Sequence, residues 1–115
     1  MTATTSGPSL ALRVRAAHLK GRLGERDADD AGAEHGYASL VDVASECSNA
    51  DLAIVLTCAP YVADGLAHLA QLQMKHGRPD DVARTLGVFD AMWPSPDPGL
   101  APTKIVTLLR AGTPR

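Results

Sequence analysis

The chain has 115 residues, enough for one small domain with a single hydrophobic core. A formal net charge of −2 gives no electrostatic case for binding nucleic acid, and no apolar run approaches the roughly 18 residues that a membrane-spanning helix needs. Because aromatic residues make up only 3%, the core must be built mainly from Leu, Val and Ala, which favours closely packed helices.

The cysteine content and the start of the chain indicate a cytoplasmic protein. Cys47 and Cys58 are the only cysteines, too few to cross-link a secreted scaffold. Residues 1–8 are small and polar and have neither the basic start nor the apolar core of a secretory signal. We expect a disordered tail over 1–8, a single helical domain over 9–112 and a frayed end over 113–115.

The first predicted helix begins near Ser9, whose hydroxyl can cap it, and extends to Leu23. One side is an apolar stripe, and the opposite side is predicted to be basic. The apolar residues are Leu12, Ala16, Leu19 and Leu23, and the basic residues are Arg13, Arg15, Lys20 and Arg22. Such a helix can bind an acidic partner or a membrane surface, whereas the simpler interpretation is a solvated face. The stripe is narrow and lacks the aromatic residues of a membrane helix.

Residues 25–36 form an acidic block with aspartates at alternate positions, as in a calcium-binding loop. Counted from Asp27, the sixth position is Gly32, as the EF-hand pattern requires. The fifth position is Ala31 and the twelfth is Ala38, and neither side chain can be a ligand. We therefore interpret the block as a loop whose charge offsets that of the basic helix before it.

Apolar residues three and four apart predict a further helix from Tyr37 to Cys47, ended by Ser48, Asn49 and Asp51. The next run, 52–58, is apolar and partly β-branched. Periodicity does not tell whether this run is a buried strand or a buried helix, so both interpretations stay open.

The stretch 60–94 predicts two antiparallel helices joined by a tight turn. The first helix has two overlapping apolar stripes, so it should have packing partners on two sides. These stripes comprise Val62, Ala63, Leu66, Ala67, Leu69, Ala70 and Met74. Gly77 stands where a helix C-cap favours glycine, and Pro79 suits the first turn of the next helix.

The second helix of this pair begins with Asp80 and Asp81, whose charges suit a helix N-terminus. Its stripe is Val82, Leu86, Phe89 and Trp93, and Pro94 should end it. Gly87 lies inside this helix, which predicts close packing against another backbone.

This pair resembles a tetratricopeptide-type repeat, about 34 residues long and built as a helical pair. The residues that carry the resemblance are Leu66, Leu69, Ala70, Gly77, Arg78, Leu86 and Pro94. Pro60 precedes Pro94 by one repeat length, and residues 52–58 then correspond to the second helix of an earlier copy. The pattern departs from the family at Val82, at Gln73 and at Val43, where the earlier copy lacks the turn glycine.

After a rigid turn over 95–99, residues 101–111 predict a last helix, with Pro102 in its first turn and Gly112 as its cap. The favoured fold class is all-α, with stacked antiparallel helical hairpins. The alternative is an α/β fragment with a strand at 52–58 and a second strand at 104–109. That alternative lacks the GxGxxG loop of a nucleotide site.

No catalytic, cofactor-binding or metal-binding residue is predicted. The four histidines are His18, His35, His68 and His76. On one helix, the eight-residue separation of His68 and His76 corresponds to about 12 Å along the axis, too far to share a metal ion. Cys47 and Cys58 have no CxxC partner, and no GxSxG nucleophile motif occurs.

The resemblance implies a binding module, because the first helix of each tetratricopeptide pair lines a concave groove. It places five residues on that lining: Asp64, Ala67, Gln71, Met74 and Lys75. The Lys–Asn clamp that some relatives use for a terminal carboxylate is replaced by Ala67 and Gln71, so a different ligand is implied. The alternative is that these residues merely pack on the adjacent helix.

We therefore expect a small adaptor or chaperone that binds a helical or extended segment of another protein. Its size and architecture are similar to those of small type III secretion chaperones. Neither nucleic acid nor a membrane is an expected partner, and assembly into a homo- or hetero-oligomer is left open. The alternative function, a small α/β enzyme subunit, depends on the strand interpretation of 52–58.

Overall fold

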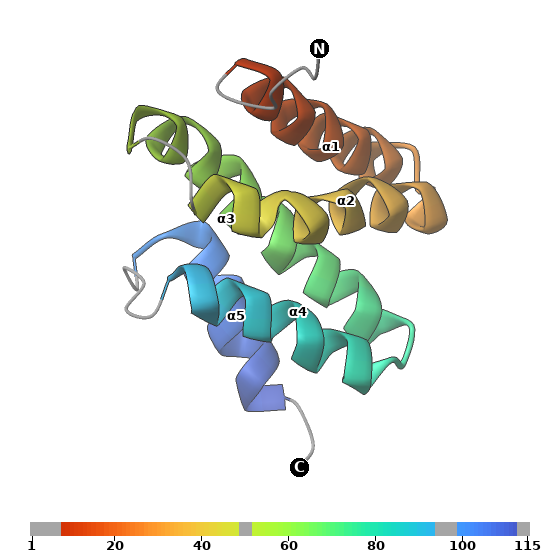
Figure 1. The fold of residues 1–115 in the computed structure, drawn as a ribbon. Helices are drawn as coiled ribbons and strands as arrows, with labels where there is room; N and C mark the ends of the chain where they lie inside the picture. Colours follow the sequence, from red (N-terminus) through yellow and green to blue (C-terminus); the bar gives the residue numbers. More distant parts are fainter. Residues whose placement is uncertain (1–7, 49–51, 94–98, 113–115) are drawn as a thin grey trace.

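The computed structural model describes residues 8–48, 52–93 and 99–112, and within these ranges all regular structure is α-helical. The helices are α1 (Pro8–Arg26), α2 (Asp30–Ser48), α3 (Leu52–Lys75), α4 (Pro79–Met92) and α5 (Ala101–Gly112) (Figure 1). The predicted all-α fold is thereby confirmed. Residues 1–7 and 113–115, predicted to be a tail and a frayed end, lie outside the described ranges, as do residues 49–51 and 94–98, which include most of the turn predicted over 95–99.

The alternative with strands at 52–58 and 104–109 is wrong. The first run is the beginning of α3, and the second lies inside α5. A strand needs a neighbouring strand to satisfy its backbone groups, whereas a helix satisfies them within its own segment. The described part of the chain offers no partner strand, so this apolar run forms a helix.

The acidic block is not a loop throughout, because only Asp27–Asp29 forms the turn and α2 begins at Asp30. Asp29 stabilises this start: its carboxylate accepts a hydrogen bond of 3.0 Å from the backbone N–H of Gly32. The start of α1 also differs from the prediction, since it lies at Pro8, one residue before the expected cap, Ser9.

The two helical hairpins α1–α2 and α3–α4 have the same turn, 49 residues apart. Ala28 and Gly77 are the two residues with positive φ, 58° and 69°, among the described residues. In the first turn, the backbone N–H of Asp29 donates a hydrogen bond to the carbonyl of Gly24. In the second turn, the backbone N–H of Arg78 donates one to the carbonyl of Gln73. Both turns thus have the hydrogen bonds of a Schellman C-cap. The predicted C-cap at Gly77 is confirmed, and the first hairpin has an alanine in the same role.

The 34-residue interval from Pro60 to Pro94 is therefore not the repeat length. Pro60 lies inside α3, and the run 52–58 belongs to the first helix of the second pair. The 49-residue shift instead matches buried positions of the two hairpins. These pairs are Gly21 and Ala70, Ala33 and Val82, Tyr37 and Leu86, and Leu40 and Phe89. One reason for the longer unit is that α3, with 24 residues, exceeds α1, with 19.

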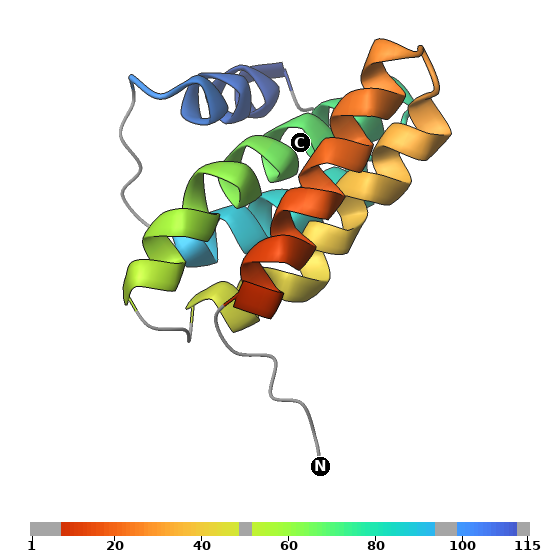
Figure 2. The same cartoon turned by 90° about the horizontal axis from the view of Figure 1, so that it is seen from above.

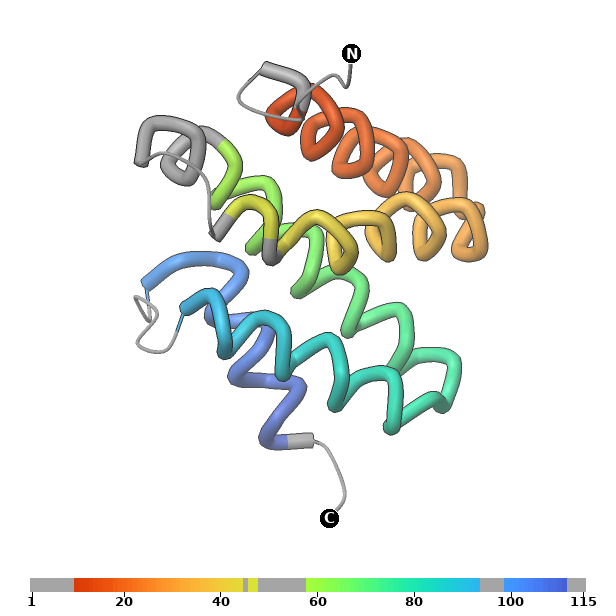
Figure 3. The backbone as a smooth tube through the Cα atoms, in the orientation of Figure 1, coloured from red at the N-terminus to blue at the C-terminus, as the bar shows by residue number. Residues whose placement is uncertain are grey.

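α3 is the central helix, because it packs against each of the other four. In Figure 1, α1 lies at the upper right, α2 passes in front of α3, and α5 passes behind α4. Seen from above, α5 lies at the opposite edge from the α1–α2 pair (Figure 2), and the tube in Figure 3 follows the same path. The five packed helices are compatible with a helical-repeat arrangement.

The core lies between α3 and its neighbours and contains Tyr37, Leu40, Leu66, Leu69 and Phe89, all at most 2% exposed. Its buried polar groups are paired: the hydroxyl of Thr85 donates to the side-chain oxygen of Gln73 at 2.7 Å. Gly87 does not pack as predicted, since a Cβ there would meet no atom within 4 Å.

Candidate functional site

Asp64, one of the predicted groove residues, lies at the centre of a polar cluster between α1 and α3. Its carboxylate is 2.7 Å from Nε2 of His18 and 3.4 Å from Nε2 of His68. Nη1 of Arg22 lies 3.8 Å away and is the weakest contact of the three. The side chain of Asp64 is 23% exposed, so these contacts cover most of it.

The cluster continues from His68 to Glu25, which lies seven residues after His18 on the same face of α1, and to α2. Nδ1 of His68 lies 3.0 Å from the carboxylate of Glu25, which also accepts a hydrogen bond from the hydroxyl of Tyr37. The imidazole of His18 makes edge contacts with the rings of Tyr37 and Tyr61, at centroid distances of 6.1 and 5.3 Å. We call the residues His18, Glu25, Tyr37, Asp64 and His68 the Asp64 cluster.

The contacts within the Asp64 cluster shift the pKa values of three of its residues, Asp64, His68 and Tyr37. The hydrogen bond from His68 keeps the pKa of Asp64 low, at about 2, and that from His18 adds to this effect. The same bond to Asp64, together with Glu25, raises the pKa of His68. Burial first, and then the bond to Glu25, raise the pKa of Tyr37. These shifts favour an ionised Asp64, a protonated His68 and a neutral Tyr37, and the contacts between them form an ion network that links α1 and α2 to α3.

The other predicted groove residues do not form one open surface with Asp64. Ala67 is fully buried, and Met74 is partly buried against the core. Gln71 and Lys75 are exposed, and they line a pocket of about 390 Å³ with Glu25, Asp30 and Leu72. Of the five residues, only these two are thus freely accessible.

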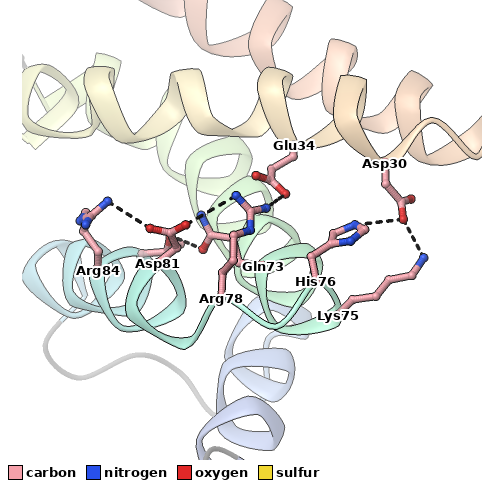
Figure 4. A network of polar contacts seen from close by, with 9 residues as sticks. Asp30, Glu34, Gln73, Lys75, His76, Arg78, Asp81 and Arg84 are labelled. Carbon is pink, nitrogen blue, oxygen red and sulfur yellow. Dashed lines mark hydrogen bonds and ion pairs between the residues drawn. The ribbon is translucent and has the colours of Figure 1, made fainter.

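Lys75 belongs to a second network, which joins the α3–α4 turn to α2 (Figure 4). Asp30 accepts from Lys75 at 2.8 Å and lies 3.3 Å from Nε2 of His76. Arg78 bonds Glu34 of α2 and lies 3.5 Å from Asp81. The pairing with Lys75 lowers the pKa of Asp30. These contacts are exposed, so they orient the turn more than they stabilise the fold.

The apolar stripe predicted for the first helix is present, but it faces away from the protein. We call Leu12, Ala16, Leu19 and Leu23 the α1 leucine face. Its three leucines are 68%, 58% and 44% exposed in chain order. The prediction that the side opposite the stripe is basic is wrong. That side carries the buried residues Leu10, Val14 and Gly21.

Close packing of small residues explains this orientation. A Cβ added to Gly24 would lie 2.4 Å from the backbone of Ala33, and one added to Gly36 would lie 2.6 Å from that of Gly21. The small-residue side of α1 therefore brings α1 and α2 into close contact. The leucines, on the other side, are left at the surface.

A pocket of about 640 Å³ lies along the α1 leucine face. It is lined by Leu12, Ala16 and Leu19, by Arg15, His18 and Arg22, and by Tyr61 of α3. The guanidinium of Arg15 lies 5.6 Å from the centroid of the Tyr61 ring. This pocket combines exposed apolar side chains with positive charge.

The Asp64 cluster was not predicted from the sequence, because its residues come from three helices and are far apart along the chain. One signal was available: Asp64 and His68 are four residues apart, on the same helical face. The partners on α1 and α2 are set by packing between the helices. Among the described residues, no group of three or more His, Cys, Asp or Glu is arranged to hold a metal ion.

Cys47 and Cys58 are buried free cysteines on neighbouring helices. Burial raises the pKa of the Cys47 thiol to about 12, with a contribution from Cys58. Such thiols are typical of core positions rather than of nucleophiles. None of the described helices is long and apolar enough to cross a membrane.

Comparison with protein families, curated proteins and solved structures finds no match to this chain.

Proposed function

We propose that this protein is a protein–protein interaction module, an adaptor or chaperone that binds a helical or extended segment of a partner protein. The observation that carries the proposal is the α1 leucine face, with three leucines 44–68% exposed along one helix. Fully burying a leucine side chain contributes about 1.5–3 kcal/mol, so this row is a source of binding energy for a partner.

The repeated hairpin supports the same proposal. Tetratricopeptide-type arrays bind their ligands with the first helix of each pair, and α1 and α3 hold that position here. Small residues at Gly21, Ala33 and Ala70 agree with the close helix packing of such arrays. The accessible surface differs from the predicted one, because the partner would bind mainly on α1, with Gln71 and Lys75 of α3 at its edge.

The alternative function, an α/β enzyme subunit, required a strand at 52–58, and that segment is helical.

Site-specific photocrosslinking in cells of the native host tests the proposal. The full chain carries benzoylphenylalanine at Leu19 or, as a matched control, at Leu108 on α5, which is 73% exposed. We expect a discrete protein adduct from position 19 that is absent from position 108 and is lost when Leu12→Ser is added.

Two outcomes of this experiment would contradict an interaction module. One is the absence of any adduct from position 19, and the other is the same adducts from both positions. Adding Lys75→Glu or Gln71→Ala to the position-19 protein then tests whether α3 contributes. An unchanged adduct yield would limit the binding surface to α1.

A further inference from the structure

The charge on α1 is one-sided. The helix carries five of the eleven Lys and Arg residues of the chain: Arg13, Arg15, Lys20, Arg22 and Arg26. Its one acidic residue, Glu25, is engaged by His68 and Tyr37 in the Asp64 cluster. The outer side of α1 is therefore rich in basic residues, and the nearest acidic side chains of other helices, Glu46 and Asp64, lie against Arg13 and Arg22.

The basic residues flank the leucines on both sides. At 100° per residue, Arg15 and Arg22 fall on one side of the Leu12–Leu19 row, while Arg13 and Lys20 fall on the other. The second pair is used within the protein, since Arg13 bonds Glu46 at 2.9 Å and Lys20 bonds His35 at 2.8 Å.

The first pair of basic residues remains available to a partner. The guanidinium of Arg15 stacks over Tyr61, and that of Arg22, with its side chain 55% exposed, comes only within 3.8 Å of Asp64. Both residues line the pocket beside the leucines.

We propose, on the basis of the proposed function, that the α1 leucine face binds an acidic amphipathic helix of a partner protein. The row from Leu12 to Leu23 extends over about 16 Å, or three helical turns. The partner helix places apolar side chains between Leu12 and Leu19 and places Asp or Glu side chains beside Arg15 and Arg22. The ion pairs with Arg15 and Arg22 determine which partner binds and in which orientation, while the leucines of α1 supply most of the affinity.

A second copy of this chain does not provide that partner. Two α1 helices packed face to face would bring their arginine rows together, and like charges across an interface are unfavourable. Outside α1, the exposed large apolar side chains among those that the structure describes are Leu108 of α5 and Leu100, just before α5. Both lie near basic residues of α5, Lys104 and Arg110. The exposed acidic residues of α4, Asp80 and Asp90, have no exposed leucine beside them.

The test uses a labelled synthetic peptide of about five helical turns, with leucines spaced as in the α1 leucine face and glutamates on both sides. Fluorescence anisotropy measures its binding to the full chain. Otherwise identical peptides with Gln or Lys in place of Glu are compared with it. The protein variants are Leu12→Ser/Leu19→Ser and Arg15→Glu, with Leu108→Ser and Lys104→Glu as matched controls on α5.

We expect the glutamate peptide to bind at least about tenfold more tightly than the lysine peptide, with the glutamine peptide between them. Arg15→Glu should weaken the glutamate peptide by about threefold to tenfold, and Leu12→Ser/Leu19→Ser should abolish its binding. Both α5 controls should bind like the wild type, and circular dichroism verifies that each variant is folded.

If all three peptides bind equally, and only the leucine variant loses this binding, the proposal of an acidic partner helix is contradicted. The proposal of an interaction module is then unaffected. If none of the peptides binds, the proposal of an acidic partner helix is also contradicted. Photocrosslinking then tests separately whether the protein is an interaction module. Two further results would overturn the acidic partner helix: binding to anionic phospholipid vesicles without peptide binding, and self-association that the leucine variant abolishes.

Discussion

Replacing Asp64 by Asn tests whether the Asp64 cluster joins α1 to α3. The carboxylate has a pKa lowered from 3.8 to about 2, and it is mostly covered by His18 and His68. A difference of nearly two pKa units corresponds to roughly 2 kcal/mol of folding free energy that is present only when the group is ionised. Asn keeps the size of the side chain but loses its charge, so we expect a loss of about 2 kcal/mol.

The pH dependence of this loss follows from the two shifted groups. A lowered pKa in the folded state means that the Asp64 contribution is present above its unfolded value near 3.8 and disappears as the pH falls towards 2. A raised pKa means that the His68 contribution is complete below its unfolded value of 6.5 and is lost as the pH rises through the folded value. The difference between wild type and Asp64→Asn should therefore be largest between about pH 4 and pH 6.5.

Urea denaturation, followed by circular dichroism at about pH 2, 5.5 and 8.5, measures these differences. Asp90→Asn is the matched control, because Asp90 is half exposed and its pairing with Arg110, at 2.6 Å, joins α4 to α5 at the surface. It should change the free energy of unfolding by less than about 0.5 kcal/mol. A similarly small effect of Asp64→Asn at pH 5.5, or a loss that is the same at every pH, would refute the proposed ion network.

Two further predictions concern backbone positions, each measured by urea denaturation at neutral pH. Gly21→Ala should lower stability by about 1–3 kcal/mol, because its Cβ would lie 2.4 Å from the buried Tyr37 ring, whereas Gly87→Ala should raise it by about 0.5–1 kcal/mol. Equal effects of the two would show that α1 and α2 are not in close contact. Ala28→Gly should raise stability by about 0.5–1 kcal/mol, because glycine adopts a positive φ without strain. The control Ala83→Gly, at an exposed position inside α4, should lower stability by about 1 kcal/mol. A destabilising Ala28→Gly would argue against the matching turns of the two hairpins.

The second hairpin was largely predictable because its signals are local. Gly77 at a C-cap, Pro79 in the first turn and the stop before Pro94 agree with the helices α3 and α4, which end at Lys75 and Met92. Such signals depend on the conformation of a few consecutive residues. The first hairpin was harder to predict, since Ala28 adopts positive φ without a glycine to mark it.

The repeat length was mistaken for a related reason. Two prolines 34 residues apart suggested a period, but Pro60 lies within α3 and ends no helix. The actual correspondence of 49 residues is visible in the hydrogen bonds of the two turns, which amino-acid types alone do not reveal. Periodicity in sequence indicates a repeat only where the same residue types perform the same structural role.

Residue types and spacing by themselves determined that this chain forms amphipathic helices, where the second hairpin turns, and that the first helix has a stripe of leucines. Only the tertiary structure decided which side of α1 is buried, because that depends on contacts between Gly21, Gly24 and the facing residues of α2. It also decided that Asp64 contacts His18, 46 positions away, instead of remaining open to a ligand. Both outcomes arise from packing between helices. The small-residue side of α1 packs closely against α2, and the leucine side of α1 is therefore left at the surface, where a partner can bind it.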